Sequence, residues 1–227
     1  MFAKKLLAGS VFMFAAGSVA AMPTDLADLE SDDGDQVFAD VSEGQYSDTY
    51  ASYVTLTDTD GDLDDSNVTL LAEYANLASG NSFGIYDQNT GEELSLFTGG
   101  TDVNTGVTIS FDLATGEATN LTTEESAEVG STFGFYIDNG DGNKYYSDPE
   151  MNDGFDPALI YDTVGTSGEG LFGSNLVVAF EDQEAGDRDY NDLVVGLTDV
   201  EAVPEPGTLA LFGMGLLGMG AAARRKS

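Results

Sequence analysis

Short runs in which apolar and polar residues alternate recur along most of this chain, and they constrain its fold more than any other feature. In residues 106–113 every second side chain is apolar, so one face of an extended segment is apolar and the other polar. Comparable runs, about ten in all and beginning at residues 36–41, are separated by turns rich in Gly, Asn and Asp. Only residues 122–128 have a helical pattern with a capping box. We therefore expect an all-β fold, an antiparallel β-sandwich of jelly-roll type, over residues 36–202.

The N-terminal residues have the features of a secretory signal. Lys4 and Lys5 precede an apolar stretch, and small residues follow it before residue 22. We expect residues 1–21 to form a signal helix that signal peptidase removes; an uncleaved membrane anchor is the alternative, which the shortness of the apolar stretch disfavours. Residues 22–35 are polar and acidic, and we interpret them as a flexible lead-in or an edge loop.

The C-terminal residues 203–227 combine three features in a fixed order. Pro204 and Pro206 end the preceding strand, residues 208–223 are almost entirely apolar, and a basic cluster follows. As a helix this apolar stretch spans about 24 Å, which is marginal for a hydrocarbon layer of about 30 Å. The basic cluster holds the C-terminus in the cytoplasm. We expect a hydrophobic anchor helix, inserted transiently in the membrane, with residues 22–203 outside the cell.

This arrangement resembles the PEP-CTERM sorting signal. The resemblance implies that Pro204, Glu205 and Pro206 are recognised by exosortase, a membrane transpeptidase, and that the helix and basic tail are then removed. It also implies a Gram-negative bacterium and a location on the cell surface or in an exopolysaccharide biofilm matrix. The alternative is a plain C-terminal membrane anchor.

Composition excludes several classes of function. The chain has no Cys, His or Trp, which rules out disulfides, Ser-His-Asp catalysis, Cys nucleophiles and His-ligated zinc. Of the seven basic residues only Lys144 and Arg188 lie between residues 22 and 203, whereas all of the 41 acidic residues except Glu205 do. So acidic a surface repels nucleic acid and anionic lipid, and it suits bound divalent cations or a saline habitat.

The densest group of acidic residues lies in one loop. Apolar strands at residues 176–180 and 193–197 flank it, and strands of this kind provide a rigid frame. Crowded carboxylates repel one another unless a cation lies among them, and Ca²⁺ takes six to eight oxygen ligands without His or Cys. The preferred ligand candidates are Glu181, Asp182, Asp187, Asp189, Asn191 and Asp192.

Two neighbouring features complete this prediction. Asp148, Glu150, Asp153 and Asp156 are spaced as if around a cavity, and we expect Asp148 and Asp153 to contribute to the metal site. Arg188 is expected to pair with Glu181 or another nearby carboxylate. In a straight strand Asp187, Asp189 and Asn191 would face away from Asp192, so one ion can contact all of them only if the loop curls. A solvated acidic hairpin is the alternative.

The residues 180–195, FEDQEAGDRDYNDLVV, also carry a resemblance. They are similar to the closing motif of a bacterial surface family called domain of unknown function 4114, and residues 143–156, NKYYSDPEMNDGFD, resemble its upstream segment. The family implies an extracellular β-rich module, often found with calcium-dependent surface proteins, and supplies no established activity.

Two further patterns leave alternatives open. Residues 58–65, DTDGDLDD, begin like an EF-hand loop but lack its sixth-position Gly, its twelfth-position Glu and its helices, so they form either a calcium site or an acidic turn. The sequence SFGIYD at residues 82–87 recurs as TFGFYID at residues 132–138. The recurrence indicates either an ancient repeat or two similar core strands.

These observations favour a structural or interaction protein that binds Ca²⁺, and we expect no catalytic residue. One alternative is a carbohydrate-binding module in which Tyr145, Tyr146 and Tyr161 stack on sugars. Another is a glycosidase with two catalytic carboxylates. The abundance of carboxylates does not favour it, because they occur throughout residues 22–203.

Overall fold

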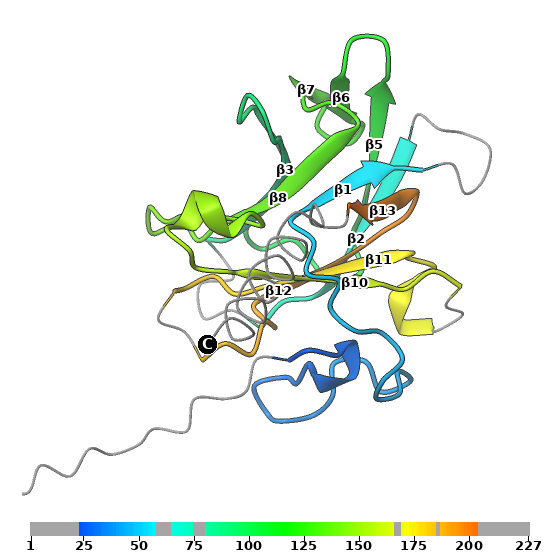
Figure 1. Ribbon diagram of the computed structural model, residues 1–227, viewed down its shortest axis with the longest axis vertical. Helices are drawn as coiled ribbons and strands as arrows, with labels where there is room; N and C mark the ends of the chain where they lie inside the picture. The colour runs from blue at the N-terminus through cyan, green and yellow to red at the C-terminus, as the bar shows by residue number, and fades with distance from the viewer. Residues whose placement is uncertain (1–22, 58–64, 75–79, 166–168, 185–186, 204–227) are drawn as a thin grey trace, which may run out of the picture.

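The computed structural model describes residues 23–57, 65–74, 80–165, 169–184 and 187–203, and within them the chain is all-β (Figure 1). The strands form two sheets, and every pairing between neighbouring strands is antiparallel. Helix in these ranges is limited to short 3₁₀ turns: η1 (Leu26–Asp28), η2 (Pro149–Asn152) and η3 (Glu169–Leu171). The all-β prediction is confirmed. The expected signal and anchor helices lie outside the described residues, as do residues 58–64 of the second acidic loop.

The first sheet contains six strands in the order β13-β1-β8-β3-β4, with β9 paired to β8. Their bounds are β13 (Val200–Val203), β1 (Tyr53–Leu56), β8 (Thr132–Asp138), β3 (Ser82–Asp87), β4 (Glu93–Phe97) and β9 (Lys144–Tyr146).

The second sheet contains seven strands in the order β10-β11-β12-β2-β5-β6-β7. Their bounds are β10 (Ala158–Asp162), β11 (Leu176–Phe180), β12 (Leu193–Leu197), β2 (Asp65–Ala72), β5 (Gly106–Asp112), β6 (Glu117–Asn120) and β7 (Glu125–Glu128).

One apolar core joins the two sheets, as expected for a β-sandwich. The alternating residues of β5 supply Val107, Ile109 and Phe111 to it, all nearly inaccessible to solvent. Phe83 of the first sheet meets Phe180 of the second edge-to-face, with ring centroids 6.0 Å apart. Since each such large side chain contributes roughly 1.5–3 kcal/mol on burial, this shared core is the main source of stability.

A second apolar cluster covers the outer face of β10, β11 and β12. Leu26 and Leu29 are completely buried there against Tyr161, Val177 and Val194. The expected lead-in at residues 22–35 therefore packs, in its described part, onto the fold (Figure 1, dark blue). Apolar side chains at intervals in an otherwise acidic segment are sufficient for this packing. As a consequence β11 is buried on both faces, as its uninterrupted apolar sequence allows.

Residues 122–128 do not form the expected helix. The buried side chain of Asn120 accepts hydrogen bonds from the backbone N–H groups of Thr122 and Thr123, which turns the chain, and residue 124 adopts a left-handed φ of 61°. The chain then returns as β7 beside β6. Residues 36–41 likewise form no strand; a single bridge joins Gln36 to Glu30, and the segment packs instead through Phe38 and Val41.

The two similar sequences at residues 82–87 and 132–138 form neighbouring strands, β3 and β8. In the β3–β8 pair Gly84 lies opposite Tyr136, and Tyr86 lies opposite Gly134. A Cβ at Gly84 would lie 2.6 Å from the Tyr136 ring, and one at Gly134 would lie 2.4 Å from the Tyr86 ring. Each tyrosine therefore covers a glycine of the other strand, which gives the recurrence a packing role whatever its origin.

Candidate metal centre

The acidic loop at residues 181–192 connects the paired ends of two adjacent strands of the second sheet, β11 and β12. Phe180, the last residue of β11, pairs with Leu193, the first residue of β12. Arg188 and Tyr190 have left-handed φ angles of 64° and 57°, which bend the chain between them. The Tyr190 side chain is buried, and its hydroxyl donates to the backbone oxygen of Asp156 at 2.8 Å. The loop is therefore curled and anchored, which the metal prediction required.

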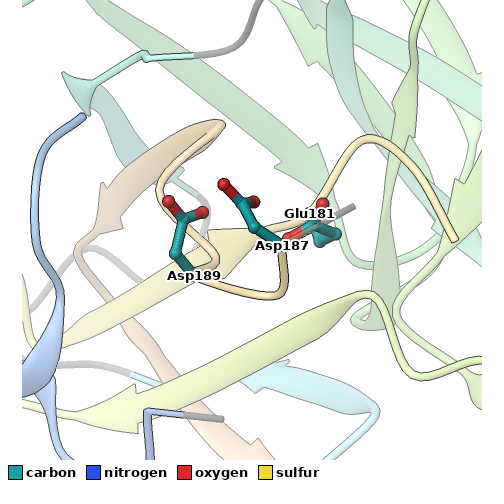
Figure 2. A group of neighbouring side chains, drawn as sticks. All are labelled: Glu181, Asp187 and Asp189. Atoms are coloured by element: carbon teal, nitrogen blue, oxygen red, sulfur yellow. The ribbon is translucent and has the colours of Figure 1, made fainter. Parts of the chain in front are cut away.

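Three of the predicted ligands meet in this loop. Glu181, Asp187 and Asp189 each place a carboxylate oxygen within 4.8 Å of those of the other two (Figure 2). Glu181 is 1% exposed, Asp189 is half-buried and Asp187 is exposed, so the group runs from the interior to the surface. One oxygen of Glu181, Oε2, is buried without a hydrogen-bond partner among the described residues. A buried carboxylate oxygen of this kind requires a donor or a cation.

The electrostatics of these residues point the same way. Burial, together with the negative charges of Asp187 and Asp189, raises the pKa of Glu181 to about 7. The pKa of Asp189 is raised by burial and by Asp187, although a backbone N–H of Asn191 favours the charged form. A cation among the three carboxylates would offset both the cost of burying their charges and their mutual repulsion. Carboxylate oxygens without His or Cys suit a hard cation such as Ca²⁺ or Mg²⁺.

Asp182 and Asp192 lie outside this group and serve to close the loop. The backbone N–H of Asp182 donates to Asp192 Oδ2 at 2.7 Å, and the Asn81 amide donates to Asp182 Oδ2 at 3.2 Å. The pKa of Asp192 is raised mainly by burial and by the nearby charge of Asp182. Neighbouring residues of an extended chain face opposite ways, which separates Asp182 from Glu181.

Asn191 orients a predicted ligand. Its side-chain Nδ2 donates to Asp189 Oδ2 at 2.8 Å and to the backbone oxygen of Glu30 at 2.6 Å. Glu30 belongs to the N-terminal segment that packs on the second sheet. The position of Asp189 therefore depends on a segment that is distant in sequence, a link that the sequence pattern did not reveal.

Asp148 and Asp153 lie at the two ends of η2 and are not members of the three-carboxylate group. Asp148 caps the start of η2 by accepting from the backbone N–H of Glu150, and it also accepts from the Tyr53 hydroxyl at 2.5 Å. Asp153 ends η2 with a left-handed φ of 55°. Helix-end chemistry explains both residues, and their expected contribution to the metal group is not seen.

The ion pair expected for Arg188 is also not seen. Across the described residues the ion pairs within 4.0 Å are those of Lys144 with Glu93 and with Asp138. The Arg188 side chain is exposed, and its charge acts at longer range by lowering the pKa of Tyr190, which burial raises. No described basic side chain therefore makes direct contact with the three carboxylates.

The tyrosines proposed as sugar platforms have packing roles. Tyr161 is completely buried in the outer cluster, and Tyr145 packs edge-to-face on Phe155 at 5.4 Å. Tyr146 meets Tyr86 edge-to-face at 5.0 Å and donates its hydroxyl to Glu93. Tyr145 and Tyr146 are nevertheless only half-buried, so sugar binding at these two rings stays a prediction.

The structure also contains a cavity that the spacing of acidic residues had indicated. Asp148, Glu150 and Asp156 line it, as the sequence suggested, but Asp48 and Tyr50 line it as well. Those two residues lie about a hundred positions away in sequence, and no local pattern distinguishes them.

Comparison with known proteins identifies one feature of the chain. Residues 202–226 match the PEP-CTERM protein-sorting motif. The chain is thus an exported protein with the signal by which exosortase sorts proteins to the cell surface. No curated protein and no solved structure matches it. The match does not extend to the acidic loop, so the resemblance to domain of unknown function 4114 stays a prediction.

The recognition tripeptide, Pro204, Glu205 and Pro206, lies outside the described residues, directly after β13. Among the described residues no helix is long and apolar enough to cross a membrane.

Proposed function

We propose that this exported protein is a calcium-binding structural or interaction module of the cell surface or of its exopolysaccharide matrix. The observation that carries the proposal is the buried Glu181 carboxylate, one oxygen of which has no partner among the described residues. It lies beside Asp187 and Asp189, which supply further oxygens. Ca²⁺ prefers such ligands, and loop backbone oxygens and water complete its coordination.

The proposed role of the ion is to hold the loop closed. Without it three carboxylates lie close together, and no basic side chain of the described residues pairs with them, whereas with it the end of the β11–β12 hairpin is fixed. Export suits this role, because binding outside the cell occurs where calcium is available at millimolar concentration and weak sites are filled. The proposal places the protein in the class of binding proteins, with exosortase and signal peptidase as its processing partners and a Gram-negative host.

The test is thermal unfolding of the purified protein in chelator and in a calcium series. We expect the melting temperature to rise with calcium concentration by several degrees, because saturation at a hundred times Kd adds about 2.7 kcal/mol. Calorimetric titration of the metal-free protein measures Kd and stoichiometry. Equal melting temperatures in chelator and in millimolar calcium, with no heat of binding, would overturn the proposal.

A matched pair of variants assigns the site. Glu181→Gln removes the buried charge with little change in shape, and we expect it to abolish the calcium-dependent shift. Glu117→Gln makes the same chemical change at an exposed position of β6 and should keep that shift. If both variants respond to calcium as the wild type does, the ion binds elsewhere and this group is not its site.

A further inference from the structure

A cavity of about 410 Å³ lies between the chain leading into β1, the start of η2 and the start of β10, and none of the three clustered carboxylates of the acidic loop lines it. This volume falls in the range of small-molecule pockets. The side chains that define its chemistry are Asp48, Tyr50, Tyr53, Asp148, Glu150 and Asp156.

The inner wall carries two carboxylates held close to each other. Asp48 is 9% exposed, and its Oδ1 accepts from the backbone N–H groups of Ile160 and Tyr50. Burial and the charge of Asp48 raise the pKa of Asp156 to about 6. Burial also raises the pKa of Asp48. Both residues therefore lie where a positive charge is favourable.

Tyrosine hydroxyls form part of the same wall. Tyr53 donates its hydroxyl to Asp148 Oδ2, which leaves the oxygen lone pairs available as acceptors. Behind it the hydroxyl of Tyr86 is completely buried and has no hydrogen-bond partner among the described residues. Burial raises the pKa of Tyr86. The next largest influences on this pKa come from polar groups of Tyr53, Ser147 and Asp148, all of which line the cavity. The Tyr86 hydroxyl thus lies near polar groups that line the cavity, although Tyr86 itself does not line it.

The geometry distinguishes this cavity from a metal site. Among the described residues the acids of the cavity do not bring three carboxylate oxygens within 4.8 Å of one another, as those of the acidic loop do. Its volume also exceeds what one ion needs. In the part of the chain that the structure describes, no Lys or Arg lines it, so no basic side chain there neutralises its carboxylates.

The entrance carries an aromatic ring. Tyr50 is 68% exposed and has a left-handed φ of 57°, so a large apolar ring is held at the surface of the cavity. A tyrosine face attracts a cation by about 0.5–1 kcal/mol at an exposed site, and it also packs on the carbon skeleton of a small molecule. Glu150 at the start of η2 adds an exposed negative charge.

We propose that this cavity binds a primary ammonium group carried by a small organic molecule, either an amino sugar unit or a free polyamine. An ammonium group has three donors and no acceptor, which complements a wall of carboxylate and hydroxyl oxygens. Tyr50 covers the organic part of the ligand, and Asp48 and Asp156 receive the charge. The site is separate from the calcium site proposed above, because the two share no residue, although the Tyr190 hydroxyl of the acidic loop donates to the backbone oxygen of Asp156.

The test is calorimetric titration of the full chain, with calcium saturating, at low ionic strength. The probes are glucosamine, its neutral counterpart N-acetylglucosamine, and spermidine. We expect glucosamine or spermidine to bind and N-acetylglucosamine to bind at least roughly tenfold more weakly, because it lacks the charge. Binding of glucosamine alone identifies a sugar site, and binding of spermidine alone identifies a polyamine site; both outcomes support the proposal.

Three variants locate the binding. Tyr50→Ala and Glu150→Gln change exposed side chains and should leave the melting temperature near that of the wild type, whereas Asp156→Asn removes a charge of the inner wall. Each should weaken binding, Asp156→Asn most, by roughly tenfold. Glu117→Gln, on β6, is the control and should not change it. The proposal is overturned if neither amine binds, if N-acetylglucosamine binds as well as glucosamine, or if all three variants bind as the wild type does. The same amine titrations are repeated in chelator. Amine binding that persists there shows that this site does not depend on the calcium proposal.

Discussion

Two acidic turns of the second sheet use their carboxylates in opposite ways. In the turn between β5 and β6, Asp112 Oδ1 accepts from the backbone N–H groups of Ala114 and Thr115, and these bonds lower the pKa of Asp112. In the loop between β11 and β12, burial raises the pKa of Glu181 to about 7, and its Oε2 has no partner among the described residues. The Asp112 carboxylate accepts hydrogen bonds within its own turn, whereas one oxygen of the Glu181 carboxylate has no described donor and could bind a ligand.

The comparison teaches where a site can be found in an acid-rich chain. Asp87 accepts from the backbone of Asn89 and Thr90, and Asp138 accepts from that of Gly140. Such residues are explained by turn chemistry and do not indicate a metal. Crowding of carboxylates is therefore a poor guide here, and a buried carboxylate oxygen without a donor is a better one.

The largest effect is expected from Glu181→Gln, on calcium affinity. Loss of the buried charge should weaken calcium binding by roughly 100-fold or more, because metal sites lose 10- to 100-fold even when a supporting residue is removed. Calorimetric titration measures the change. In chelator the melting temperature should not fall, since the charge removed was repelled by its neighbours. If Glu181→Gln binds calcium as tightly as the wild type, Glu181 is not a ligand and the proposed difference from Asp112 is wrong.

Leu29→Ala should destabilise the whole fold and affect the acidic loop more than the Asp112 turn. Leu29 is completely buried in the outer cluster, and removing such a side chain costs about 2–5 kcal/mol. Glu30, the next residue, holds Asn191 and through it Asp189. We expect a lower urea midpoint together with weaker calcium binding. Unchanged affinity in the folded variant would show that the N-terminal segment does not support the site.

The stability of the calcium-free protein should fall as the pH rises from about 5 to about 7. The pKa of Glu181 is raised from 4.5 to about 7 in the folded protein, so over this interval the folded state holds a proton that the unfolded state has released. The loss is at most about 3 kcal/mol for this group, at about 1.4 kcal/mol per pKa unit. Asp156 and Asp192 shift in the same direction.

Melting curves in chelator across this pH range measure the effect, and excess calcium should reduce it, because the ion favours the charged form of Glu181. Glu181→Gln in chelator should reduce the slope as well. A melting temperature that rises with pH in chelator would contradict the raised pKa values and, with them, the difference between the two turns.

The smallest effect is expected from Asp112→Asn. The side chain is exposed, and asparagine also accepts hydrogen bonds from the backbone of such a turn, so the melting temperature should change least in this variant. The calcium-dependent shift should match that of the wild type. A marked loss of calcium binding would mean that exposed acids such as Asp112 take part, and the comparison would fail.

The sequence predicted the strands well where alternation or apolar runs were strong. The bounds of β3, β8, β11 and β12 agree with the expected segments, because burial of one or both faces determines which residues can occupy them. The strands β6, β7 and β13 were not expected, since each has only four residues and β6 and β7 are largely polar. The helix expected at residues 122–128 failed because one buried side chain, Asn120, determines the turn.

The candidate site was predicted only in part. The spacing of Glu181, Asp187 and Asp189 identified the loop, but the sequence did not show that Asp182 would face away or that Asp148 and Asp153 would cap η2. The arrangement of the acidic loop depends on left-handed residues such as Tyr190 and on contacts with Glu30 and Asn81, whereas Asp148 and Asp153 cap η2 through local turn geometry. Contacts between residues more than a hundred positions apart leave no periodic signal in one sequence.

The reciprocal covering of glycine by tyrosine in β3 and β8 has a consequence for how the first sheet assembles. No hairpin turn joins these strands, so nothing in the connection dictates which residue pairs with which. The alignment must be encoded in side chains: a slip by two residues would place a tyrosine ring where there is no glycine to admit it. The two glycine–tyrosine contacts thus favour a single register of the β3–β8 pair over alternatives shifted by two residues.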